Sequence, residues 1–492
     1  MYLTFDAGTT ALKTALIGAD GGVLAVHSVE YTPSSPRPGW LEMEPDAYWR
    51  AMVTGAREVL AGRDATGLAA IGFSSQGQTF VPLDAAGRPL HPFIVWLDGR
   101  AREIAARWEA EWLSRDRYRR ICGYPWVPGE LTLFKIAWLR EHRPEAHAAS
   151  IFLCLPDYLI WRLTGEFATD AAIAQQSGMY DVRAGEWSPE LLDAAGISAE
   201  QLPLVHPPGT VIGETLSAAQ ELGIPPGIPA CVGCNDQLAG ALGAGNVRPG
   251  PVTETTGTSL AVIATTDQPV EDERMYVGPH AAPGMWQVMP FAPVSAIVLT
   301  WFRDLGGGSD YEQLVAGAAE VTPGSDGLTL LPHFSGTASP GFNPDARGAM
   351  VGLTLGHGRA HIARAIMESC ACLLREMTDI IRERGIAVER VRSLGGAARS
   401  DLWLQMKADM LGLPVERPAC PDAASLGAAM LAATGTGRFS SVGDAADAWY
   451  RAERTFEPDA QKAGVYGEVF ARYVGLCGRL YENGGGSEDP PS

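Results

Sequence analysis

Residues 5–13 read FDAGTTALK, and residues 255–259 read TTGTS. Each stretch lies between two runs that are typical of β-strands, so each is predicted to form the turn of a hairpin. The backbone N–H groups and hydroxyl side chains of such turns can donate hydrogen bonds to phosphate oxygens. Two similar turns roughly 250 residues apart indicate two related domains that hold a nucleotide between them.

The size and charge of the chain narrow the functional classes. Its 492 residues are enough for two large domains, and 46% hydrophobic with 19% charged residues is typical of a globular protein. A formal net charge of −19 argues against a nucleic-acid partner, which needs Lys and Arg for its phosphates. A Walker A loop is excluded because none of the lysines follows a glycine: Lys13, Lys135, Lys407 and Lys462.

The cysteines and the termini predict a cytoplasmic protein without a membrane partner. The eight cysteines are scattered, and Cys231 and Cys234 lie in an apolar run that predicts buried strand residues rather than a redox motif. The N-terminus lacks the features of a signal peptide, and no apolar run approaches a membrane span. The tail at residues 483–492, NGGGSEDPPS, is predicted to be disordered.

Strand-like and helical patterns alternate along the chain, which predicts an α/β fold with a largely parallel sheet. Expected strands cover residues 2–5, 11–17, 23–28, 69–73, 93–97 and 391–394, and expected helices cover residues 44–61, 238–245, 361–384, 400–412 and 425–434. Asp46 is the expected N-cap of the first helix, and Ser400 is the expected N-cap of the helix that ends near Gly412. The Gly/Pro-rich stretch 243–251 interrupts both patterns. We therefore expect one domain over residues 1–246 and a second over residues 247–482.

Asp236 is the first candidate for catalysis. It follows the apolar run 228–232 and precedes a helix of small residues, so it is placed at the carboxyl end of a strand beside the predicted boundary. With no cation nearby, its carboxylate is free to accept a proton. The alternative is that Asp236 or Asn235 serves as the N-cap of the helix.

Further candidates lie just beyond the ends of other strands. Gly395, Gly396 and Ala397 form a strand-to-helix turn that lets the backbone approach a flat ligand such as adenine. Gln76, Gln78, Asp98 and Arg100 either bind the hydroxyl groups of a polyol or are simply polar turn residues.

The order of these motifs resembles the FGGY family of carbohydrate kinases, from about residue 1 to residue 441. Besides the two turns, the resemblance is carried by GWLEMEPDAYW (39–49), IVWLDGRA (94–101), PDYLIWRLTGEFATD (156–170), GCNDQLAGALGAG (233–245), PDARGAMVGLTLGHGRAHIARAIMES (344–369), SLGGAARSDLWLQMKADMLGLPV (393–415) and SLGAAMLA (425–432). It implies two actin-like, ribonuclease-H-like domains with a cleft between them. The subgroup most similar to this chain is the xylulokinases.

The resemblance also implies roles for individual residues. Asp236 is implied to be the general base that takes the proton of a primary hydroxyl on a pentulose such as D-xylulose, and Asp6 is implied to be needed for Mg²⁺-ATP, with Asp236 as a second metal-site carboxylate. The implied ATP-binding residues are Gly8, Thr9, Thr10, Lys13, Gly257, Thr258, Gly395, Gly396 and Ala397. The expected substrate-binding residues are Gln76, Gly77, Gln78, Asp98, Asp236 and Gln237. Members of the family are often dimers, so a homodimer is also expected.

Three departures bear on the acceptor. Gln76-Gly77-Gln78 stands where xylulokinases carry Gln-Met-His, Asp236-Gln237 replaces Asp-Asn, and residues 335–340 read SGTASP in place of SGERTP. Because these changes alter the hydrogen-bonding groups of the pocket, the acceptor can be another polyol such as ribulose, erythritol, glycerol or a signalling sugar. Two readings from other classes are a non-catalytic sugar or nucleotide sensor and an actin-like or chaperone-like ATPase.

Overall fold

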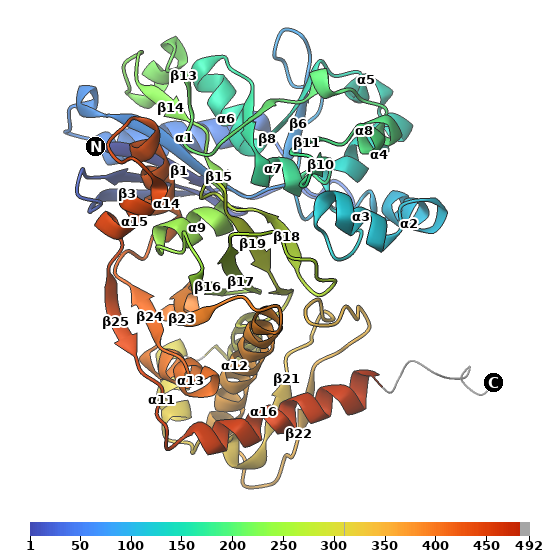
Figure 1. Cartoon of the computed structure of the whole chain (residues 1–492), viewed down its shortest axis with the longest axis vertical. Coiled ribbons are helices and arrows are strands. Elements are labelled where there is room, and N and C mark those ends of the chain that lie inside the picture. Colours follow the sequence, from blue (N-terminus) through green and yellow to red (C-terminus); the bar gives the residue numbers. More distant parts are fainter. Residues whose placement is uncertain (309, 483–492) are drawn as a thin grey trace. The chain divides into compact units, whose positions relative to one another are not determined.

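The computed structural model describes residues 1–308 and 310–482 (Figure 1). The chain divides into two compact units, and neither is continuous in sequence. Unit 1 contains Met1–Arg248, Thr266–Gln287 and Asp422–Tyr450, and unit 2 contains Pro249–Thr265, Val288–Pro421 and the described residues from Arg451 onward. Unit 1 therefore includes two segments, Thr266–Gln287 and Asp422–Tyr450, that follow the predicted boundary at 246/247 in the sequence. The predicted tail at 483–492 lies outside the described residues.

Unit 1 is built on a mixed sheet with the strand order β13-β14-β5-β1-β2-β3. Strand β1 (Tyr2–Ala7) pairs antiparallel with β2 (Ala11–Ile17), which pairs antiparallel with β3 (Val23–Glu30). On its other side β1 is parallel to β5 (Ala70–Ser75), and β5 is parallel to β14 (Pro229–Cys231) and to β15 (Cys234–Asn235). Strand β13 (Val211–Glu214) closes that edge. The strands predicted at 2–5, 11–17, 23–28 and 69–73 are confirmed.

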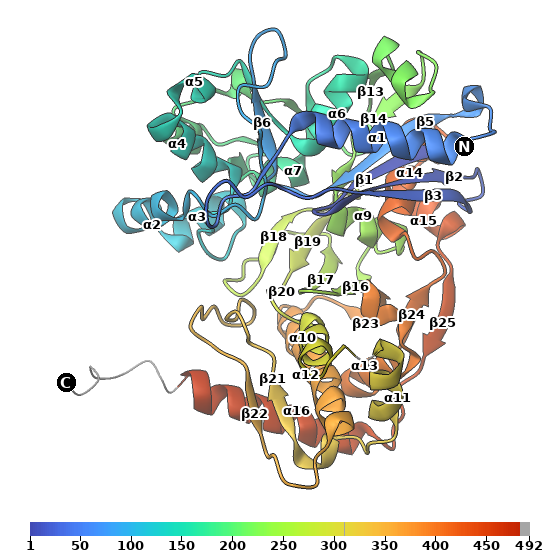
Figure 2. The ribbon, with the colours of Figure 1, turned by 180° about the vertical axis from the view of Figure 1, so that it is seen from behind.

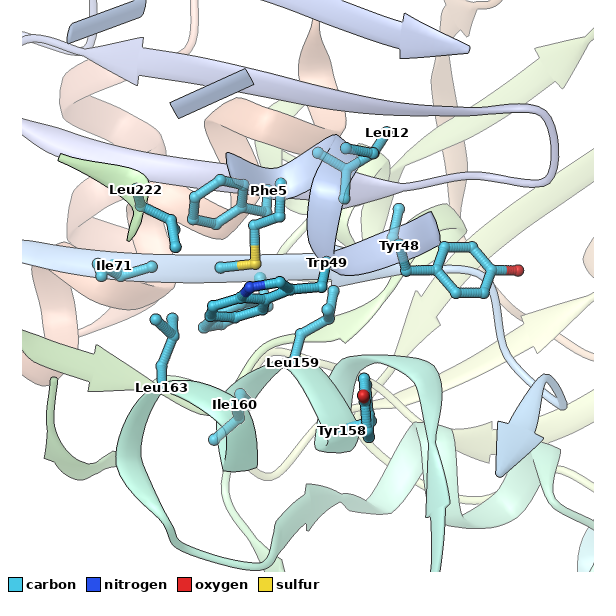
Figure 3. Close-up of a cluster of buried hydrophobic side chains, with 14 of the residues drawn as sticks. Phe5, Leu12, Tyr48, Trp49, Ile71, Tyr158, Leu159, Ile160, Leu163 and Leu222 are labelled. Atoms are coloured by element: carbon cyan, nitrogen blue, oxygen red, sulfur yellow. The ribbon is translucent and has the colours of Figure 1, made fainter. Parts of the chain in front are cut away.

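One face of this sheet is covered by helices α1 (Pro45–Leu60) and α6 (Leu155–Thr164), as Figures 2 and 3 show. Figure 3 draws part of the buried cluster, in which Phe5 and Ile71 of the sheet pack with Trp49 of α1 and Leu163 of α6. Helix α1 confirms the prediction for residues 44–61. The prediction that Asp46 is its N-cap is wrong, because Glu44 takes that position and Asp46 lies in the first turn.

The other face of the sheet packs against α14 (Ala423–Gly435), which in turn packs on α9 (Asp236–Gly243). The two helices approach closely at Gly243 and Gly427. A Cβ atom built on Gly427 would lie 1.9 Å from the carbonyl oxygen of Ala239, and one on Gly243 would lie 1.8 Å from that of Ala423. Small residues in both helices therefore allow backbone-to-backbone packing. Helix α15 (Val442–Trp449) follows α14.

A second, four-stranded sheet of unit 1 has the order β4-β7-β6-β8, formed by Glu42–Met43, Phe93–Ile94, Phe80–Leu83 and Ile151–Cys154. It shares a hydrophobic core with α2 (Arg102–Glu111), α3 (Arg115–Cys122), α4 (Thr132–His142) and α8 (Pro189–Ala195). Strand β7 is shorter than the predicted strand 93–97, because the chain turns at residues 96–97, where the Asp98 amide donates to the Val95 carbonyl. Strand β9 (Ala168–Asp170) then leads into α7 (Ala171–Gln176).

Unit 2 repeats the central arrangement of strands. Strands β16 (Gly250–Thr256) and β17 (Leu260–Thr266) form an antiparallel hairpin, and β16 is parallel to β23 (Val388–Leu394). The sheet continues through β24 (Val415–Pro418), parallel to β23, to the antiparallel β25 (Ala452–Phe456). In each unit, therefore, a hairpin with a Gly-Thr turn is followed by a parallel neighbour from later in the chain.

The helices of unit 2 are α10 (Ile297–Leu305), α11 (Tyr311–Ala319), α12 (Arg359–Glu383), α13 (Asp401–Leu411) and α16 (Ala463–Cys477), with a β21–β22 hairpin formed by Thr329–Leu331 and Ala349–Val351. The predicted helices at 361–384 and 400–412 are confirmed. As expected, the Ser400 hydroxyl caps α13 by accepting from the Trp403 amide. Among the described residues, no helix has the length and apolar character needed to span a bilayer.

Candidate active site

The candidate site of unit 1 lies at the carboxyl edge of its main sheet. On β5, Ser74 lies opposite Asp6 of β1 and also opposite Cys234 of β15. All three strands are parallel, so their carboxyl ends meet at one edge, where α/β sheets place their ligands. Asp6 and the Asp236 that follows β15 are therefore brought to the same edge with β5 between them.

Asn235 and Asp236 divide the two roles that the sequence left open. Asn235 is the N-cap of α9, and its Oδ1 accepts from the Gln237 amide at 3.0 Å. Asp236 is the first helical residue; its Oδ1 accepts from the Gln237 amide at 2.7 Å and from Asn235 Nδ2 at 2.9 Å. Within the described part of the chain, Oδ2 of Asp236 has no hydrogen-bond partner. One carboxylate oxygen is thus held and the other is available.

Both carboxyl groups bind protons more readily than usual. Burial, followed by the nearby charge of Asp6, raises the pKa of Asp236 to about 7. Burial also raises the pKa of Asp6, against the effect of Ser74, whose Oγ donates to Asp6 Oδ1 at 2.7 Å. Both residues lie deep among protein atoms yet keep partial exposure, so a ligand can reach them.

These carboxylates suit a magnesium ion. Mg²⁺ prefers hard oxygen ligands and is usually held by one or two carboxylates, with waters and substrate phosphates completing its coordination. Among the described residues, no group of three or more His, Cys, Asp or Glu side chains could hold a metal ion. A cation here would offset the repulsion that contributes to the raised pKa of Asp236.

The first Gly-Thr turn connects β1 and β2 beside these acids. Thr9 Oγ1 accepts from the indole Nε1 of Trp96 at 2.9 Å, whereas Thr10 is exposed. Lys13, opposite Asp6 in the hairpin, donates to Asp422 at 2.6 Å. Its charge lowers the pKa of Asp6, although burial outweighs this effect. Gly8, Thr9, Thr10 and Lys13 thus belong to one short segment next to Asp6.

The turn after β5 carries Gln76, Gly77 and Gln78. Gln76 is buried, and its Nε2 donates to the Tyr48 hydroxyl at 3.4 Å. Gln78 has a φ of 66°, an uncommon conformation for a residue with a side chain. Its carbonyl accepts from Thr132 Oγ1 at 3.1 Å. Strained backbone of this kind is concentrated at functional sites.

Asp98 and Arg100 make the contacts of structural turn residues. Asp98 is fully buried; its oxygens accept from the Leu41 amide at 2.6 Å and from the Arg100 guanidinium at 2.8 Å. Arg100 also pairs with Glu42 at 2.8 Å and stacks on the Trp40 ring. Of the two alternatives for this pair, the contacts favour the structural one, and substrate binding by Asp98 stays a prediction.

In unit 2 the second Gly-Thr turn and the Gly395–Ala397 turn lie side by side. Thr255 of β16 is opposite Leu394 of β23, so each turn leaves the sheet at the same level. Gly395 has a φ of 78°, and a Cβ atom there would lie 2.9 Å from the Thr256 carbonyl oxygen. Space beside Gly257 and Gly396 is open, and Thr258 is exposed. This pair of turns can receive a ligand against bare backbone.

A buried ion pair fixes the strand that leads into the second turn. Lys407 of α13 and Glu254 of β16 are both fully buried, with Nζ and Oε1 2.5 Å apart. Lys407 also donates to Thr256 Oγ1 at 3.0 Å, and Ser393 of β23 donates to Glu254. Because a buried charge is costly without its partner, these contacts hold both strands in register just before the turn.

Comparison with known families decides what these sites belong to. The model for the N-terminal domain of the FGGY family of carbohydrate kinases matches residues 1–243, and the model for its C-terminal domain matches residues 253–436. The chain belongs to the FGGY family of carbohydrate kinases. The resemblance inferred from the motifs is confirmed, and so is the two-domain actin-like fold.

The relatives of this FGGY kinase are named after two different substrates, glycerol and xylulose. A glycerol kinase from Bordetella parapertussis is 34% identical over 93% of this chain and 92% of its own length. A xylulose kinase from Escherichia coli is 31% identical over 95% of this chain and 96% of its own. The crystal structure of a xylulose kinase from Rhodospirillum rubrum aligns with a TM-score of 0.90 at 31% identity, covering 98% of this chain and 99% of that one.

Several site residues of the FGGY kinase were missed by reasoning from the sequence. Ser74 on Asp6, Trp96 on Thr9, Asp422 on Lys13 and Gln176 beside Gly77 come from segments distant in sequence. A partial signal was present for Ser74 only, because it directly follows the strand predicted at residues 69–73 and begins the polar turn that contains Gln76. Asn235 was considered as a cap, but its contact with Asp236 was not anticipated.

Proposed function

We propose that this FGGY kinase transfers the γ-phosphoryl group of ATP to the primary hydroxyl of a pentulose, with D-xylulose as acceptor and D-xylulose 5-phosphate as product. The observation that supports it most is the carboxylate of Asp236, with one oxygen fixed by hydrogen bonds and the other without a partner in the described chain. Relatives named xylulose kinases support the acceptor.

In the proposed reaction Asp236 acts as general base. Its Oδ2 accepts the proton of the acceptor hydroxyl while that oxygen attacks the γ-phosphorus in line with the leaving oxygen. Asn235 and the Gln237 amide hold Oδ1, which fixes the direction of Oδ2. In phosphoryl transfer the protein contributes mainly positioning and electrostatic stabilisation, so a preorganised carboxylate is the kind of group required.

The nucleotide is assigned to the two Gly-Thr turns and the Gly395–Ala397 turn. Gly8, Thr9, Thr10 and Lys13 of unit 1, and Gly257 and Thr258 of unit 2, offer N–H, hydroxyl and ammonium donors suited to phosphate oxygens. Gly396 leaves open backbone for the adenosine, next to Gly395, which packs against Thr256. Asp6 and Asp236 would hold Mg²⁺, which supplies positive charge to the phosphates when bound.

Glycerol is the second candidate acceptor. The specific observation in its favour is the glycerol kinase that is 34% identical to this chain. The Asp236-Gln237 pair also departs from the Asp-Asn pair expected of a xylulokinase. Both candidates present a primary hydroxyl, so the proposed role of Asp236 is the same for either.

A coupled ADP-release assay over an acceptor panel tests this proposal. The panel contains D-xylulose, D-ribulose, erythritol, glycerol and buffer alone, each with Mg²⁺-ATP. We expect ADP release that depends on the acceptor, highest with D-xylulose, and a product that gains one phosphate by mass spectrometry. If another acceptor gives the highest rate, that compound replaces D-xylulose as the proposed substrate. ADP release that does not depend on any acceptor would contradict the proposed kinase reaction.

A further inference from the structure

Gln176, the last residue of α7, occupies the space beside Gly77 in the turn after β5. A Cβ atom built on Gly77 would lie 1.6 Å from Gln176 Oε1 and 2.7 Å from its Cδ. The φ of Gly77 is not positive, so the backbone would accept a side chain there. The three atoms nearest to such a side chain all belong to Gln176: its Oε1, its Cδ and, at 3.0 Å, its Cβ. A Met at this position, as in xylulokinases, would require the Gln176 side chain to move.

The contacts of Asn235 fix which end of the Gln176 carboxamide faces inward. Asn235 Oδ1 caps α9 by accepting from the Gln237 amide, so its Nδ2 must point the other way. Nδ2 donates to Gln176 Oε1 at 3.0 Å. Nε2 of Gln176 is therefore the opposite end, and in the part of the chain described here it has no hydrogen-bond partner. Gln176 is only partly buried, so these N–H donors can be reached.

The same amide group joins Gln176 to the proposed base. Asn235 Nδ2 also donates to Asp236 Oδ1 at 2.9 Å, which places Asn235 as a bridge between the carboxamide and the carboxylate. An acceptor whose hydroxyl meets Asp236 Oδ2 thus lies next to a residue with unused donors. A donor-only group recognises an oxygen of the acceptor, either a carbonyl or a hydroxyl.

We propose that Gln176 selects the acceptor. Its carboxamide takes the place of a side chain at position 77, and its Nε2 donates to an acceptor oxygen other than the one that receives the phosphoryl group. This inference rests on the proposed function. It assigns the site to polyhydroxylated acceptors, ketoses or alditols, that carry such an oxygen near the reacting hydroxyl, and it predicts discrimination against analogues that lack it.

The test measures equilibrium binding and turnover for Gln176→Leu, which keeps the bulk and removes the donors. Binding of the best acceptor is followed by tryptophan fluorescence without nucleotide. We expect the acceptor Kd and KM to rise about tenfold, the KM for ATP to stay within about twofold, and the preference for the acceptor over its monodeoxy analogues to shrink. The matched control is Gln220→Leu, an exposed glutamine remote in sequence from these turns.

Two further variants test whether the Gln176 side chain fills the volume that a side chain at position 77 would occupy. Gly77→Met alone should lose acceptor binding or thermal stability, because its side chain meets Gln176. The double variant Gly77→Met, Gln176→Gly should recover stability and change the ranking of acceptors. Unchanged acceptor Kd in Gln176→Leu, together with unchanged ranking in the double variant, would overturn the inference.

Measuring acceptor binding apart from phosphoryl transfer distinguishes failure of this inference from failure of the proposed function. If wild-type protein binds a polyol but transfers no phosphate, the kinase proposal fails while the Gln176 variants still decide the inference by Kd. If no acceptor binds to the wild type in either assay, both are overturned.

Discussion

Lys13 Nζ donates to Asp422 Oδ1 at 2.6 Å, although 409 residues separate the two in sequence. Lys13 lies in the hairpin of the first Gly-Thr turn, and Asp422 is the N-cap residue of α14. Asp422 makes no side-chain cap bond to its own helix. Its carboxylate instead supplies a counter-charge for Lys13 beside the proposed phosphate site.

Single variants of Asp422 and Lys13 distinguish the contribution of this ion pair to stability from the contribution of Lys13 to ATP binding. The side chains of Lys13 and Asp422 are 35% and 17% exposed, so Asp422→Asn should lower the free energy of unfolding by less than about 1 kcal/mol. Lys13→Met should instead raise the KM for ATP about tenfold, because a charged donor to phosphate is lost. Urea denaturation and initial-rate kinetics measure the two effects. Equal ATP kinetics in wild type and Lys13→Met would remove Lys13 from the nucleotide site.

Trp96 links the loop after β7 to the first turn. Trp96→Phe keeps a ring but removes the N–H that donates to Thr9 Oγ1 at 2.9 Å. Because one neutral hydrogen bond contributes about 0.5–1.5 kcal/mol, kcat/KM for ATP should fall roughly two- to tenfold. Initial rates at varied ATP provide the measurement, and Trp301→Phe, a variant of a partly exposed tryptophan in unit 2, is the control. A wild-type value in Trp96→Phe would show that Thr9 needs no such support.

Gly427 should tolerate no side chain. In Gly427→Ala the new Cβ would meet the Ala239 carbonyl oxygen at 1.9 Å; since backbone cannot move aside easily, the free energy of unfolding should fall by about 1–3 kcal/mol or more. Gly464→Ala is the matched control, because Gly464 lies in α16 with open space around it. That variant should be neutral or more stable by up to about 1 kcal/mol. Equal melting behaviour of the two variants would contradict the close packing of α9 and α14.

The buried carboxyl group of Asp170 should make the free energy of unfolding decrease as the pH rises. Its Oδ1 caps α7 by accepting from the Ala172 amide at 2.7 Å, and burial raises its pKa from 3.8 to about 7. The folded state therefore keeps a proton that the unfolded state releases, so the stabilising contribution is complete below pH 3.8 and is lost as the pH rises to about 7.

Asp170→Asn cannot ionise and keeps an oxygen for the cap. Relative to wild type, its free energy of unfolding should increase between about pH 4 and pH 7 by up to several kcal/mol and stay level above that range. Urea denaturation across this pH range gives both curves. Parallel curves would show that Asp170 is already charged in the folded protein.

The predictions from sequence succeeded where the signal is local. The two hairpins, helix α12 and the cap at Ser400 follow from patterns within a few residues. The N-cap of α1 was misplaced because Glu44 and Asp46 both flank Pro45, and only the backbone conformation distinguishes them. Short strands such as β7 were overextended, because an apolar run continues into the turn that Asp98 holds.

The candidate site was predictable only in part, for a physical reason. Asp6 directly follows the predicted strand 2–5 and Asp236 follows the apolar run 228–232, so both could be placed near strand ends from the sequence alone. Gln176 could not, because its contact with Gly77 depends on how α7 packs against the turn after β5. The hydrogen bonds that the Asn235 side-chain amide donates to Gln176 and Asp236 could not be predicted either. They depend on the orientation of Asn235, which is fixed by its cap of α9.

The most direct test of the account is the rate of phosphoryl transfer in Asp236→Asn, measured in a single turnover with saturating acceptor and Mg²⁺-ATP. We expect a rate lower by about 10²–10⁴-fold, since a positioned base contributes that much, with ATP binding retained. Asp46→Asn, an exposed acid in the first turn of α1, should keep the wild-type rate. A near-normal rate in Asp236→Asn would contradict the assignment of Asp236 as the base.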